Sequence, residues 1–102
     1  MNIALLHDHY DEDHLRKMID YMGDHGVPPV IKAVWMECYN FWAALEGCHR
    51  IRAAKVLGLP VIIDEIDYSD APLSSIGITD IDYDYTVSEI VDDAHRREII
   101  TI

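Results

Sequence analysis

The residues best suited to chemistry in this sequence are consecutive: Gly47, Cys48, His49 and Arg50, with Arg52 two positions further on. They open a run typical of a helix, so Gly47 would let the backbone approach a ligand while the first helical amides face an anion. His49 and Arg50 would add side-chain donors, and the fork of an arginine matches a phosphate. The pattern predicts a phosphate site formed by all five residues, and the alternative is a glycine turn whose basic side chains face water.

Three residues of the same stretch are candidates for catalysis: Cys48, His49 and Glu46. A helix amino terminus and a neighbouring arginine activate a thiol, so Cys48 could act as a nucleophile. Glu46, like Asp8 and His9, is a candidate general base, and His49 is the remaining candidate catalytic residue. The alternatives are a buried, inert Cys48 and a Glu46 that pairs with Arg50 or Lys55.

The run HDHYDEDH, residues 7–14, is rich in groups that bind divalent metals such as magnesium. Asp8 and His9 are the candidate ligands, although the spacing matches no closed zinc pattern. The acids at positions 11–13 have another explanation, because acceptors and negative charge are favoured where a helix begins.

The elements that would hold these residues follow from the apolar pattern and the turn residues. Leu15, Met18, Ile19 and Met22 recur at helical spacing before Gly26, and Thr86 and Glu89 have the spacing of a capping box. We expect a mixed α+β fold with strands at 3–6, 30–36, 41–45 and 61–66, the middle two forming a hairpin. The expected helices are one that starts at residues 11–13 and stops at Gly26, one at 49–57 and one at 87–100.

Composition limits the partners of this 102-residue, single-domain chain. Its formal charge is −11, and residues 61–102 hold eleven of the nineteen acids, which would repel duplex DNA. We therefore do not expect sequence-specific DNA binding, whereas the acidic C-terminal part could meet a basic protein partner. No signal peptide or membrane span is evident, so we expect a cytoplasmic protein with reduced thiols and no bridge between Cys38 and Cys48.

The run GCHRIRAAKVLGLP, residues 47–60, resembles the arginine-rich motif of the amino-terminal domain of ParB-type partition proteins. Upstream, DEDHLRKMIDYMGDHGVPPVIKAVW is similar to that family's acidic helix start, helix, glycine, proline and strand. The resemblance covers residues 1–67 and implies a stand-alone ParB/sulfiredoxin-like domain that binds a nucleoside triphosphate, ATP or CTP, with relatives that are nucleases or kinases. Residues 68–102 would be an acidic loop and a C-terminal helix packed on the same domain or on a second copy in a homodimer. The regions that follow this domain in partition proteins have no counterpart here, which suits a phage or plasmid accessory protein.

The tetrapeptide GCHR is also identical to the active-site motif of sulfiredoxins, which share that fold. This second resemblance implies an ATP-dependent thiol enzyme in which Cys48 attacks an activated sulfinic acid while His49 and Arg50 hold phosphate. The predicted function is binding of a nucleotide or another phosphate-containing small molecule, with phosphohydrolase, phosphotransferase or nuclease activity left open. The alternatives are the thiol enzyme and a non-catalytic acidic adaptor.

Overall fold

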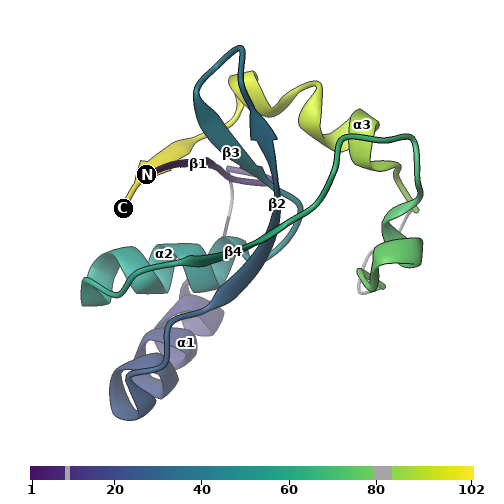
Figure 1. The fold of residues 1–102 in the computed structure, drawn as a ribbon. Helices are drawn as coiled ribbons and strands as arrows, with labels where there is room; N and C mark the ends of the chain where they lie inside the picture. Colours follow the sequence, from purple (N-terminus) through teal and green to yellow (C-terminus); the bar gives the residue numbers. More distant parts are fainter. Residues whose placement is uncertain (9, 80–83) are drawn as a thin grey trace.

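A single mixed sheet organises the molecule, whose computed structural model describes residues 1–8, 10–79 and 84–102. Its strands lie in the order β4-β2-β3-β1-β5 (Figure 1). The protein therefore has the predicted α+β fold. In chain order the elements are β1 (Asn2–Ala4), α1 (Glu12–His25), β2 (Val30–Met36), β3 (Phe41–Ala44), α2 (Cys48–Leu57), β4 (Ile62–Glu65), η1 (Leu73–Ile76), α3 (Val87–Val91), η2 (Ala94–Arg96) and β5 (Ile99–Thr101).

Local signals set the bounds of the two longer helices. Asp11 precedes α1, and its side chain accepts a hydrogen bond from the His14 amide at 2.9 Å. Gly26 ends α1 in the left-handed conformation, with φ at 64°. Left-handed glycines, Gly47 and Gly58, likewise flank α2 on both sides. These boundaries confirm the predicted helices to within one residue.

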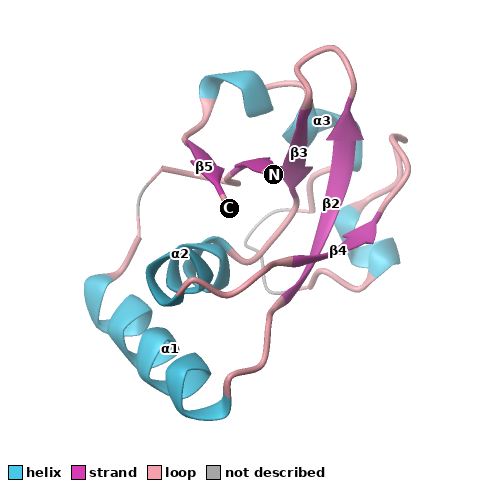
Figure 2. Cartoon of the chain, turned by 60° about the vertical axis from the view of Figure 1, so that its left-hand side comes forward, coloured by secondary structure: helices cyan, strands magenta, loops and turns pink. Residues whose placement is uncertain are grey.

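The sheet combines antiparallel and parallel pairs. Strands β2 and β3 form the predicted antiparallel hairpin, whereas β1 runs parallel to β3 and β4 runs parallel to β2. On one face, Ile3, Ile31 and Ala44 belong to a core with side chains of α1 and α2. On the other face, Val34 and Phe41 pack with Leu73, Val87 and other residues of the C-terminal segment. Figure 2 shows α1 and α2 on one side of the sheet and α3 on the other.

The prediction of one helix over residues 87–100 was wrong in its length. The capping box of Thr86 and Glu89 forms as predicted, but α3 ends at Val91. Two acids, Asp92 and Asp93, follow at once, and negative charge is unfavourable at the carboxyl end of a helix. The next residues form η2 and then β5, whose β-branched side chains suit the antiparallel pairing with β1.

Strand β4 occupies the edge of the sheet, and two of its four residues, Asp64 and Glu65, are acids. Its residue Ile62 pairs with Val30 of β2, and these two side chains are 50% and 51% exposed. Among the helices that the structure describes, none combines the length and the apolar character that a membrane span requires.

Candidate functional site

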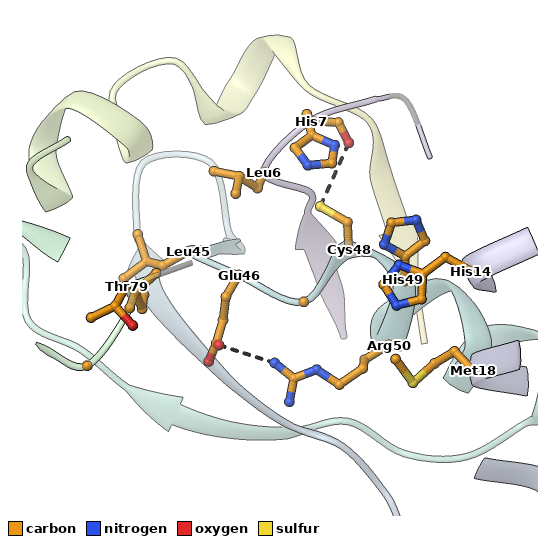
Figure 3. A pocket seen from close by; sticks show the side chains of 13 residues that line it. Leu6, His7, His14, Met18, Leu45, Glu46, Cys48, His49, Arg50 and Thr79 are labelled. Carbon is orange, nitrogen blue, oxygen red and sulfur yellow. Dashed lines mark hydrogen bonds and ion pairs between the residues drawn. The ribbon is translucent and has the colours of Figure 1, made fainter. Parts of the chain in front are cut away.

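A cleft of about 410 Å³ lies where β1 and β3 end and α2 begins. Because β1 and β3 are parallel neighbours, their carboxyl ends meet at one edge of the sheet, which is a common position for ligand sites in α/β proteins. Figure 3 shows the side chains around the cleft. The lining residues are Leu6, His7, His14, Met18, Leu45, Glu46, Gly47, Cys48, His49, Arg50, Gly77, Ile78 and Thr79.

Gly47 is required at its position by backbone conformation and by packing. Its φ of 76° is in the left-handed region, and no side chain caps the helix that it precedes. A Cβ atom on Gly47 would lie 2.4 Å from Ile31 Cδ1 and 3.2 Å from Arg50 Nη2. The sequence predicted a glycine that lets the backbone approach a ligand, and the structure shows a close approach to Ile31.

Arg50 and Glu46 form an ion pair on one wall of the cleft (Figure 3). Arg50 Nη2 donates to Glu46 Oε1 at 3.1 Å, and Arg50 Nη1 donates to the Val30 carbonyl at 3.1 Å. The other oxygen of Glu46 accepts a hydrogen bond from the Lys32 amide. Glu46 therefore pairs with Arg50, which was the alternative to a catalytic role. The bonds to Glu46 and Val30 fix the direction of the Arg50 guanidinium.

His49 links the start of α2 to the start of α1. Its Nε2 accepts a hydrogen bond from the Asp11 amide at 3.0 Å, which assigns the ring proton to Nδ1. The ring also stacks on His14 with 4.2 Å between centroids. Burial, followed by the neighbouring His14 and His7, lowers the pKa of His49 below its usual 6.5, so the ring is neutral at pH 7. His49 therefore carries one N–H donor, at Nδ1, and no positive charge.

Cys48 lines the cleft as a buried thiol. Its side chain is only 4% exposed, and Sγ donates to the His7 carbonyl oxygen at 3.9 Å. Burial and hydrogen bonding to a backbone carbonyl are typical of a structural cysteine. Both Cys48 and the exposed Cys38 are free thiols, as predicted.

Arg52 points away from the cleft and is not among its lining residues. Its guanidinium donates to the Asp8 carbonyl at 3.0 Å, pairs with the Glu98 carboxylate and lies over the Tyr10 ring at 4.5 Å. The side chain is only 12% exposed. Of the five residues predicted to bind phosphate, the structure therefore brings four together and directs the fifth toward the chain that leads into α1.

The predicted metal ligands Asp8 and His9 do not form a described site. Asp8 is exposed, and its Oδ1 accepts a hydrogen bond from the Glu98 amide at 2.7 Å. His9 lies outside the described residues. Over residues 1–8, 10–79 and 84–102, no group of three or more histidine, cysteine or acidic side chains is arranged to hold a metal.

Several lining residues were not predicted as part of a phosphate site. His7 and His14 belong to the run considered for metal binding, and the sequence carries no signal that His14 would stack on His49. Gly77, Ile78 and Thr79 come from the loop after η1, thirty residues from the motif, and only the packing of the C-terminal segment brings them to the cleft.

Comparison of the chain with protein-family models, with curated proteins and with solved structures gives no significant match.

Proposed function

We propose that the protein binds the phosphate group of a nucleotide, or of another small phosphate ligand, in the cleft at the start of α2. One observation carries this proposal: the first turn of α2, preceded by a glycine with no side-chain cap, opens on a cleft that Arg50 and three histidines also line. The amides of a first helical turn and the helix dipole favour an anion at this position. This is the site that the resemblance to ParB-type domains predicts.

Different side chains around the cleft contact different parts of the ligand. Arg50 is the phosphate ligand, because a guanidinium has more N–H groups than its bonds to Glu46 and Val30 use. His49 donates from Nδ1, since its Nε2 already accepts from the Asp11 amide. Leu6, Met18 and Ile78 contribute apolar surface to the cleft for the uncharged part of the ligand. Arg52 positions the chain around Asp8 and does not contact the phosphate.

A hydrolytic or phosphotransfer activity, with Glu46 or His49 as base and magnesium as cofactor, is a further hypothesis. Among the described residues no group of three or more metal ligands forms, so they supply no magnesium site. We therefore derive no step that depends on a metal. The alternative of a thiol enzyme rests on the position of Cys48 in the cleft, and the burial of that thiol favours the phosphate site without a nucleophile.

A thermal-shift panel tests the proposal. ATP, ADP, CTP, GTP and inorganic phosphate are added at 1 mM as test concentration, with and without magnesium, and a true ligand raises the melting temperature by mass action. A ligand present at ~100 times its Kd stabilises the protein by about 2.7 kcal/mol. The variant Arg50→Lys keeps the charge but loses the fork, and it should reduce the shift strongly. The matched control Arg16→Lys changes an exposed arginine of α1.

The expected result is a shift with at least one nucleotide that Arg50→Lys reduces and Arg16→Lys leaves unchanged. If every ligand leaves the melting temperature unchanged, or if both variants respond alike, the cleft is not the proposed site.

A further inference from the structure

One end of the sheet is left uncovered on the face that packs against α1 and α2. Side chains alternate along β2, so Ile31, Ala33 and Trp35 share this face. Ile31 and Ala33 are fully buried, whereas Trp35 is 40% exposed. Figures 1 and 2 show why: the outer half of the β2–β3 hairpin extends beyond both helices, while the C-terminal segment lies on the opposite face.

A pair of tryptophans forms the centre of this exposed surface. Trp35 on β2 lies directly opposite Trp42 on β3, and the ring centroids are 5.2 Å apart in an edge-to-face arrangement. The chain has two tryptophans, and both are here. Trp35 is exposed, whereas Trp42 is partly buried against the core. An exposed tryptophan is costly to leave in water, and tryptophans are enriched among the residues that dominate protein interfaces.

Three exposed carboxylates lie on the segments next to the tryptophan pair. Glu65 on β4 lies opposite Ala33, and it therefore shares the face of Trp35. Asp67 follows Glu65 by two residues, just beyond the carboxyl end of β4, which runs parallel to β2. Glu37, in the hairpin turn, follows β2 beyond Trp35, and all three acids are exposed.

We propose that this aromatic and acidic surface, formed by Trp35, Trp42, Glu37, Glu65 and Asp67, docks an arginine- or lysine-rich segment of a protein partner. The faces of the indole rings attract cations, and the carboxylates on the adjacent segments add ion pairs. A nucleic acid would be repelled by the same acids and by the net charge of −11. A second copy of this chain would bring like charges together, because a symmetric contact pairs the same patch with itself. A basic protein segment is the occupant that satisfies both components, and this inference does not depend on the cleft.

Titration with an arginine–glycine repeat peptide tests the proposal. Because both tryptophans belong to the surface, their fluorescence reports binding at the proposed place. The variant in which Glu37, Glu65 and Asp67 become their amides should weaken binding by about tenfold, given three exposed charge pairs. The control replaces three acids of α1 with amides and has the same net charge: Asp13→Asn, Asp20→Asn and Asp24→Asn. It should change the affinity by less than about twofold, because screened charges far from the peptide contribute little.

A second pair of variants addresses the aromatic component. Trp35→Ala should weaken binding measured by calorimetry, whereas Tyr68→Ala, which removes another exposed ring, should not. Equal losses in the two amide variants would show attraction by net charge alone and overturn the proposal, as would unchanged fluorescence at saturating peptide. A dimer seen by sedimentation and abolished by Trp35→Ala would overturn it in favour of a second copy.

Discussion

Replacing Gly47 with alanine tests the close approach that shapes the cleft. The left-handed φ of 76° costs an alanine about 1 kcal/mol. The new Cβ would lie 2.4 Å from Ile31 Cδ1, far inside the ordinary separation of carbon atoms, and such overpacking costs about 2 kcal/mol more. Gly47→Ala should therefore lower the free energy of unfolding by about 3 kcal/mol, which corresponds to about 15 °C in melting temperature for a domain of this size.

Gly26→Ala is the matched control. Gly26 has a similar φ of 64°, but a Cβ there meets nothing within 4 Å. This variant should lose only the conformational term of about 1 kcal/mol, and the difference between the two variants isolates the contact with Ile31. Urea unfolding followed by circular dichroism gives both free energies.

Removing the atom that causes the overlap should rescue the variant. Ile31→Val deletes Cδ1 and alone costs about 1 kcal/mol, yet in the Gly47→Ala background it relieves the overlap. The double variant should be more stable than the sum of the single effects by about 2 kcal/mol. The contact with Ile31 is not the reason for a glycine at position 47 if the effects of Gly47→Ala and Ile31→Val simply add. The same holds if Gly47→Ala and Gly26→Ala lower the free energy of unfolding equally.

Four further predictions concern other residues. Burial lowers the pKa of His49 in the folded protein, so on acidification the unfolded chain binds a proton at a higher pH than the folded chain does. The free energy of unfolding should therefore fall as the pH drops below about 6.5, and an equal fall in the His49→Gln variant would contradict this. With a thiol reagent, Cys38 should react at once and Cys48 only in denaturant, and two fast thiols would favour the thiol enzyme. Thr86→Ala should cost about 1 kcal/mol of unfolding free energy by removing the capping box, and an unchanged urea midpoint would contradict it. Arg52→Met should cost about 2 kcal/mol while any nucleotide-dependent shift in melting temperature persists, and loss of that shift would make Arg52 a ligand.

The predictable parts of the fold depend on neighbours in sequence. Asp11 and Gly26 bound α1, and Gly58 ends α2, because caps and left-handed residues act within one turn. The hairpin is equally local. Strand β5 was missed because its pairing with β1 joins residues at opposite ends of the sequence, and no local pattern reports such a partner.

The residues of the candidate site were also predictable only where they are neighbours in sequence. Gly47 to Arg50 are consecutive, so one motif places all four at the start of α2. Arg52 shares the motif but lies on another side of the helix, where Asp8 and Glu98 decide its direction. Composition and spacing cannot supply that information, because the partners are distant in sequence.

The wall of the cleft at Leu6 has a consequence for how the protein matures. Three hydrogen bonds join this wall to the C-terminal segment. The Leu5 amide donates to the Glu98 carbonyl, the Arg97 side chain donates to the Leu6 carbonyl, and the Glu98 amide donates to the Asp8 carboxylate. A nascent chain emerges from the ribosome amino terminus first. Asp8 and Glu98 are separated by about ninety residues, so these bonds cannot form until that length of chain has been synthesised after β1. The cleft is therefore completed only after translation has passed Glu98, and ribosome-bound chains truncated before that residue should lack this wall.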